Sequence, residues 1–238
     1  YLNESAIVLF AVTNTATLKN PENAKNLLAV AATGAAPNQD TFCRGGTGPT
    51  SDGRRKPEVY APGCGTLSAR SNTPCDTVAM TGTSMATPVV AGAALLVREY
   101  FVEGYYPTGI ANAIDAFEPS GALLKAVLVN SAQDMTGLAG YPSLQEGWGR
   151  VRLDGALFLP GDVSTTIVRD VRNIAGLSTA QQSEVLVNVQ PGEPLHVTLV
   201  WTDPPAAANA SFAPINNLDL VVVPPDGDPA YVGNDFAS

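Results

Sequence analysis

The most informative stretch of this chain is Gly-Thr-Ser-Met-Ala-Thr-Pro at positions 82–88, continued by Val-Val-Ala-Gly at 89–92. Ser84 stands among small residues at the start of an almost uncharged helical pattern that extends to about Tyr100. Pro88 favours the first helical turn, because proline has no N–H to donate further along a helix. A hydroxyl at the N-terminal end of a helix lies where developing negative charge is stabilised. Ser84 is therefore the candidate nucleophile.

The segments around this helix are typical of a layered α/β domain, which we expect over residues 1–160. Two apolar runs are continuous rather than alternating, as in parallel strands that are buried on both faces. They lie at residues 6–12 and 27–32, and a shorter strand is expected at 58–61. The Gly, Pro, Thr and Asp residues between positions 34 and 56 predict a long surface loop.

A second helix is predicted between residues 120 and 131. Ser120 is a good N-cap, because its hydroxyl can accept a backbone N–H of the first turn. Apolar residues then recur at helical spacing, at Leu123, Leu124, Val127 and Leu128. This helix and the buried strands together support the α/β assignment.

The pattern changes after Pro160, where apolar and polar residues alternate between Gly- and Pro-rich turns. Such alternation predicts half-buried strands of an all-β domain, a jelly-roll-like sandwich over residues 161–238. The expected strands are residues 163–171, 183–189, 195–201 and 218–223. Four or five strands are too few for a complete sandwich, so we expect this domain to be incomplete.

The charge of the chain limits its partners. Its net charge is −9 at pH 7, which argues against nucleic acid and anionic membranes as partners. The longest apolar runs, such as residues 6–12, are too short to span a bilayer. The chain starts at Tyr1 without a basic n-region or cleavage-site pattern, so we expect any targeting segment to have been removed or never present. Only 15% of the residues are charged, as is common in extracellular enzymes, so we expect a secreted protein.

Three cysteines leave at least one without a partner inside the chain. Cys64 and Cys75 flank a turn-like Ser-Asn-Thr-Pro stretch, so a disulfide between them is expected in an oxidising compartment. Cys43 would then be free or bound outside this chain. Three unpaired cysteines are the alternative.

The segment around Ser84 resembles the nucleophile segment of the subtilisin-like serine proteases. Three further stretches are similar to that family: residues 10–14, 24–33 and 48–63. Other motifs resemble bacterial alkaline subtilases that carry a C-terminal β-barrel or jelly-roll domain; they are residues 147–151, 199–203, 217–220 and 231–236. The likeness covers essentially the whole chain.

The resemblance implies a role for two residues. Ser84 would be the nucleophile that attacks a peptide carbonyl. The side-chain amide of Asn14, together with the backbone N–H of Ser84, would bind the oxyanion. Thr13 stands where the family usually has glycine before this asparagine, and this β-branched residue would alter the wall of the specificity pocket.

A serine nucleophile depends on a general base, and this sequence offers no suitable candidate for that role. The family orders its triad Asp, His, Ser along the chain, so the Asp and the His are both expected upstream of Tyr1. The single histidine is His196, which we expect to face solvent on a strand. The chain alone is therefore expected to be inactive.

No cofactor is expected for catalysis, and no His/Cys cluster has the spacing of a zinc site. Asp219 and Asp235 match positions that resemble calcium ligands in the related proteases. Because calcium takes six to eight oxygen ligands, structural Ca²⁺ is expected only if further residues contribute, and two surface carboxylates remain the alternative.

Three functional hypotheses follow. The leading one is a serine endopeptidase, present as its C-terminal portion, whose partners are a peptide substrate and the N-terminal portion of the same protease. The alternative is a pseudoprotease or peptide-binding scaffold that keeps the fold without a complete triad. A third treats residues 163–238 as a binding module, although Trp201 sits in a strand-core pattern that does not favour a stacking platform.

Overall fold

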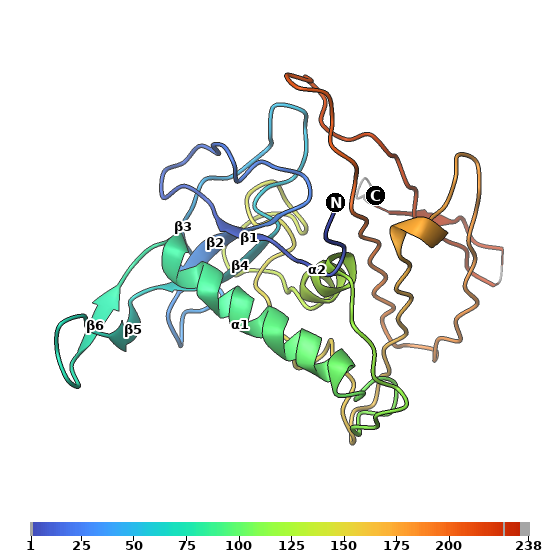
Figure 1. The fold of residues 1–238 in the computed structure, drawn as a ribbon, viewed down its shortest axis with the longest axis horizontal. Helices are drawn as coiled ribbons and strands as arrows, with labels where there is room; N and C mark the ends of the chain where they lie inside the picture. The colour runs from blue at the N-terminus through green and yellow to red at the C-terminus, as the bar shows by residue number, and fades with distance from the viewer. Residues whose placement is uncertain (1, 226, 234–238) are drawn as a thin grey trace.

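A computed structural model describes residues 2–225 and 227–233 (Figure 1). Its centre is a four-stranded sheet in which β2 (Leu28–Gly34) pairs with every other strand. β1 (Leu9–Ala11) and β4 (Val59–Cys64) run parallel to β2, and β3 (Phe42–Arg44) runs antiparallel. Together with the helices below, this sheet confirms the mixed α/β class expected for the first part of the chain.

The core explains why the sequence of β2 is continuously apolar. Leu28, Val30 and Ala32 pack toward the helices, whereas Ala29 and Ala31 pack on the other face, in a cluster that also contains Val12, Leu27, Tyr60 and Met135. Both faces of β2 are therefore covered, which is the condition for a strand without alternation.

The run at residues 6–12 behaves differently from the prediction. Its strand, β1, is three residues long and only partly buried, with Val8 and Phe10 exposed. β1 lies at the edge of the sheet, where one side has no neighbour in the described residues. The expected fully buried strand is thus wrong here, whereas the strand expected at 58–61 exists and continues to Cys64.

α1 (Thr83–Val102) covers one face of the sheet, and α2 (Gly121–Asn130) lies beside it (Figure 1). α1 packs against β1, β2 and β4, and α2 packs against α1. The Ser120 hydroxyl accepts the Leu123 N–H at 2.9 Å, which confirms the predicted N-cap. Pro88 lies one turn further into α1 than predicted, because this helix begins at Thr83.

α1 also has the length and composition of a membrane-crossing helix, with 20 residues and a mean hydropathy of 1.4. It is the one such helix among the described residues. Its contacts with three strands identify it as a core helix of the α/β layer.

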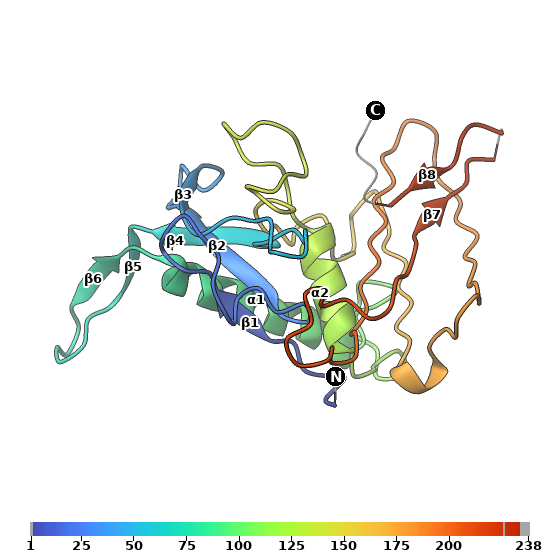
Figure 2. The same ribbon diagram turned by 90° about the horizontal axis from the view of Figure 1, so that it is seen from above.

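The segment between β4 and α1 forms a hairpin that the sequence did not predict. β5 (Thr66–Ala69) pairs antiparallel with β6 (Thr77–Met80), and the hairpin projects from the body of the molecule (Figure 2). The expected Cys64–Cys75 disulfide is wrong. Cys64 is bridged to Cys43, and Cys75 is a free, exposed thiol near the end of the hairpin.

The C-terminal part differs most from the prediction. In the described residues after Pro160, regular structure consists of the 3₁₀ turn η1 (Asn173–Ala175) and one ladder between β7 (Val221–Val222) and β8 (Tyr231–Val232). The strands expected at 163–171, 183–189 and 195–201 are wrong for this structure, since none joins a ladder. The boundary at residue 160 and the jelly-roll-like domain remain predictions.

Candidate active site

Ser84 lies in the first turn of α1. Gly82 is the N-cap residue, Thr83 is the first helical residue, and Ser84 follows as an exposed residue. The backbone N–H groups of a first turn have no carbonyl partner within the helix, so that of Ser84 is available as a donor. Within the described residues, the Ser84 hydroxyl makes no hydrogen bond to another group.

Asn14 reaches this turn from the loop that follows β1. Its Oδ1 accepts the backbone N–H of Thr83 at 3.0 Å and the Thr83 hydroxyl at 3.3 Å. The Thr83 hydroxyl also lies 2.5 Å from the carbonyl oxygen of Val12. The structure therefore joins the end of β1 to the start of α1, and brings the two sequence-predicted residues, Ser84 and Asn14, to the same helix end.

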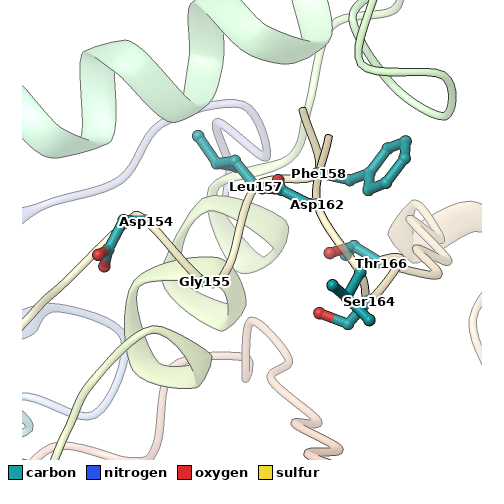
Figure 3. Close-up of a pocket in the computed structure, with 8 residues that line it drawn as sticks. Asp154, Gly155, Leu157, Phe158, Asp162, Ser164 and Thr166 are labelled. Atoms are coloured by element: carbon teal, nitrogen blue, oxygen red, sulfur yellow. The ribbon is translucent and has the colours of Figure 1, made fainter. Parts of the chain in front are cut away.

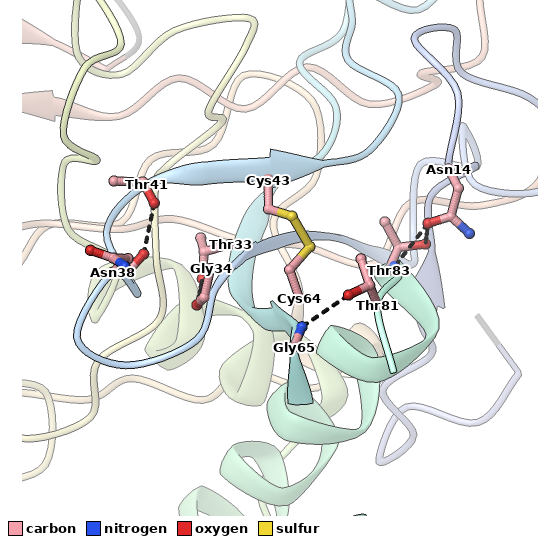
Figure 4. The surroundings of a disulfide bond; sticks show 10 residues. All are labelled: Asn14, Thr33, Gly34, Asn38, Thr41, Cys43, Cys64, Gly65, Thr81 and Thr83. Carbon is pink, nitrogen blue, oxygen red and sulfur yellow. Dashed lines mark hydrogen bonds between the residues drawn. A yellow bond between two sulfur atoms is a disulfide. The ribbon is translucent and has the colours of Figure 1, made fainter. Parts of the chain in front are cut away.

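The two polar atoms of the Asn14 amide differ in their hydrogen bonds. Oδ1 is taken by Thr83, whereas Nδ2 has no acceptor among residues 2–225 and 227–233 (Figure 4). An ideal Cβ placed on Gly82 would lie 3.5 Å from Nδ2, so the nitrogen lies directly over the turn. Two donors, the Ser84 N–H and Asn14 Nδ2, thus lie at the positive end of α1, as anion stabilisation requires.

A close approach of two glycines sets the position of the turn. The Gly82 N–H donates to the Gly63 carbonyl at 2.9 Å, at the end of β4. A Cβ on Gly63 would come within 2.7 Å of the Gly82 oxygen and 2.9 Å of the Ala86 Cβ. β4 can therefore touch the start of α1 only because position 63 has no side chain.

A buried ionic cluster anchors the beginning of β4. Glu58 Oε1 accepts Lys56 Nζ at 2.6 Å and Lys125 Nζ at 2.9 Å, and Oε2 accepts the Ala29 N–H at 2.7 Å. Burial raises the pKa of Glu58, but Lys125 and Lys56 together hold that pKa below its ordinary value. Burial lowers the pKa of Lys56 to about 8, against the opposing charge of Glu58.

His196 does not join this site. It is exposed and makes no hydrogen bond within the described part of the chain. The segment that carries it lies on the opposite side of the molecule from the β5–β6 hairpin and the start of α1 (Figures 1 and 2). The expectation that His196 faces solvent is confirmed, although its segment is not a strand.

The calcium expectation finds no support in the described residues. Asp219 is exposed, Asp235 lies outside the described residues, and no group of three or more His, Cys, Asp or Glu side chains among those described could hold a metal ion. A polar hollow of about 110 Å³ is lined by Asp154 and Asp162 among other residues, with Asp154 at one end and Ser164 and Thr166 at the other (Figure 3). Asp154 is paired with Arg152, so this hollow is not a ready cation site either.

Sequence reasoning missed the residues that connect the site. Thr83 holds Asn14 through two hydrogen bonds, and Gly63 holds Gly82 through one. The strand expected at 58–61 predicts only where the strand ends, and not that the following Pro62-Gly63 pair contacts a helix. No local pattern identifies a glycine whose partner lies 19 positions away.

Comparisons with known proteins agree with this geometry. The model of the subtilase family, Peptidase_S8, matches residues 2–149. The serine protease/ABC transporter B family proteins tagB and tagA of Dictyostelium discoideum are similar, at 32% identity over 80% of this chain and 33% over 75%. The chain spans only 13% and 11% of their lengths.

A similar fold has been solved in the prenylagaramide maturation protease PagA. The TM-score is 0.50 at 21% identity, and the alignment covers 64% of this chain and 50% of that one. At this identity the likeness concerns the fold alone.

Proposed function

This chain belongs to the subtilase family, and from that premise we propose that it is the serine-bearing part of a serine endopeptidase. Ser84 is the nucleophile in this proposal, and Asn14 is the oxyanion-hole donor. The observation that carries it is the pair of hydrogen bonds from Thr83 to Asn14, next to an exposed serine at a helix N-terminus.

The chemistry follows from the two donors. The Ser84 Oγ attacks the carbonyl carbon of a peptide bond while a general base takes its proton. The carbonyl oxygen becomes an oxyanion, which accepts the Ser84 N–H and the Asn14 Nδ2–H. The base then returns the proton to the peptide nitrogen as the intermediate collapses. The amine leaves, and an acyl-enzyme remains on Ser84, which water then hydrolyses.

The Asp and the His of the triad are proposed to come from polypeptide outside these residues, the N-terminal portion of the same protease. The support is an exposed apolar surface along α1 and β1. α1 exposes Val89, Leu95 and Leu96, the last two at 66% and 57%, and β1 pairs only with β2 among the described strands. A long exposed apolar surface of this kind marks an interaction site.

The shape of this surface fits a protein segment. A groove of about 320 Å³ runs between β1 and α1, lined by apolar side chains that include Ile7, Leu9, Ala94 and Leu95. An apolar segment that adds a strand to the open edge of β1 would fill the groove. It would also provide hydrogen-bond partners for the backbone N–H and C=O groups at that edge. None of the comparisons supports the pseudoprotease alternative.

We also propose a secreted location for the parent protein. The Cys43–Cys64 disulfide supports this proposal, because disulfides form and persist in oxidising compartments. Structural calcium and a jelly-roll-like domain over residues 161–238 remain proposals, as does a peptide or protein substrate.

The test is peptide hydrolysis by this chain combined with its N-terminal portion. Three proteins are compared: the native sequence, Ser84→Ala and Asn14→Asp. Asp at position 14 keeps the oxygen that accepts from Thr83 but removes the amide donor, so it separates the oxyanion role from the structural one. We expect no turnover with Ser84→Ala and a loss of about 10²–10³-fold or more in kcat with Asn14→Asp. Hydrolysis by the Ser84→Ala protein would overturn the proposal.

A further inference from the structure

The Cys43–Cys64 disulfide lies next to the turn that carries Ser84. Cys64 stands between Gly63 and Gly65, and both neighbours bind the segment that leads into α1. The Gly63 carbonyl accepts the Gly82 N–H at 2.9 Å, and the Gly65 N–H donates to the Thr81 hydroxyl at 2.9 Å. Figure 4 shows the bridge, the Gly65–Thr81 bond and the Thr83–Asn14 contact together.

Strand pairing is irregular around Cys64. The register of β2 against β4 shifts between Thr33 and Gly34, beside Cys64, and that of β2 against β3 shifts between Ala32 and Thr33. Pro62 has no N–H to add to the ladder. The covalent bond therefore lies where regular strand pairing is interrupted on both sides of β2.

There is little free space between the bridge and the nucleophile turn. A Cβ on Gly63 would approach three atoms within 3 Å, from Ala32, Gly82 and Ala86. Tightly packed contacts of this kind transmit a displacement rather than absorb it. A shift of Cys64 would thus move Gly82 and, with it, the first turn of α1.

We propose that the Cys43–Cys64 disulfide is a positioning element for the Ser84 turn, so that its reduction loosens this turn. The expected loss of activity on reduction rests on the proposed function, whereas the expected loosening of the Ser84 turn does not. In the reaction, a dithiol reductant gives two electrons and two protons to the bridge. The S–S bond breaks, Cys43 and Cys64 become thiols, and the reductant becomes a disulfide. Both cysteines are half-buried, so a small reductant has a route to them.

The first experiment follows backbone hydrogen exchange in the 238-residue chain. It compares the native protein, the double variant Cys43→Ser/Cys64→Ser, and Cys75→Ser, a matched control that removes the exposed free thiol. The amides of Gly65 and Gly82 report the two hydrogen bonds directly, and the amides of α2 report global opening. We expect exchange at Gly65 and Gly82 to become about tenfold faster or more in the double variant, with a smaller change in α2 and none in Cys75→Ser. Unchanged exchange at both glycines would overturn the proposal, as would an equal acceleration throughout α2.

The second experiment measures the rate at which a fluorophosphonate labels Ser84 in the chain combined with its N-terminal portion. We expect reduction to slow labelling by about 10- to 100-fold, the scale of a misplacement of about 1 Å, and reoxidation to restore it. An unchanged labelling rate in a reduced protein that labels well when oxidised would overturn the proposal. If the oxidised protein does not label at all, the proposed function fails, while the exchange result still decides whether the bridge positions the turn.

Discussion

Replacing Glu58 by Gln should destabilise the chain by about 3–5 kcal/mol, the cost of leaving buried charges without their partner. Glu58 Oε1 accepts two ammonium groups, those of Lys56 and Lys125, and Oε2 accepts the Ala29 N–H. An amide has one oxygen and one NH₂, so in either orientation the NH₂ faces a donor. Lys56, at 1% exposure, and Lys125 would then face each other without a negative charge.

The matched control is Lys56→Met, which removes one of the two positive charges. Glu58 Oε1 and the Leu27 carbonyl both keep Lys125 as a donor, at 2.9 Å in each case, so no acceptor is left without a partner. We expect this variant to change stability by less than about 1 kcal/mol, because Lys125 still neutralises Glu58 and no buried charge is left without a partner. Urea denaturation at pH 7 measures both variants. The reasoning is refuted if Glu58→Gln costs less than about 1 kcal/mol, or if Lys56→Met costs as much as Glu58→Gln.

Three further predictions concern Lys56, Lys25 and Gly63. Burial lowers the pKa of Lys56 in the folded chain to about 8, from its ordinary value of 10.5. Between these two pH values unfolding therefore takes up a proton. The contribution of Lys56 to the free energy of unfolding should thus rise with pH in that window. Urea titrations at pH 7 and 9.5 test this, and an unchanged difference between the native protein and Lys56→Met contradicts it. Lys25→Met should release the segment around Asp203, because Lys25 Nζ lies 2.5 Å from Asp203 Oδ2; limited proteolysis should then cut residues 203–216 faster, and an unchanged cutting rate counts against the contact. Gly63→Ala should cost about 1–3 kcal/mol through overpacking, and a thermal midpoint equal to the native one would show that the contact with Gly82 is looser than described.

The elements that the sequence predicted well are those specified by local patterns. β2 was visible as a continuous apolar run, and α2 as an N-cap followed by helical spacing, because each pattern is contained within about a dozen residues. α1 was predicted within two residues at each end. For the site, the position of Ser84 at a helix start came from the same local information.

The parts that failed depend on contacts between distant residues. The spacing around a turn favoured Cys64–Cys75, but β3 and β4 both lie beside β2 and bring Cys43 to Cys64 instead. The hydrogen bonds of Asn14 to Thr83 span 69 positions, which no local pattern reveals.

The strands predicted between residues 163 and 201 failed for another reason. Alternation predicts a strand only if one face becomes buried, and here Val163 and Leu186 remain 95% and 96% exposed. These apolar side chains have no core to enter within the described residues. Their pattern therefore gives extended chain without ladders in this structure.

Ser84 is proposed to be a nucleophile that needs a general base from outside this chain. The most direct test is labelling with a fluorophosphonate, followed by mass-spectrometric mapping of the labelled residue, with and without the N-terminal portion. A serine hydroxyl is barely ionised at neutral pH, and removal of the histidine costs about 10⁶-fold in kcat in subtilisin. We predict rapid labelling of Ser84 only in the combined protein, and none in its Ser84→Ala variant. Rapid labelling of Ser84 in the isolated chain, or labelling of another residue in the combined protein, would contradict the account.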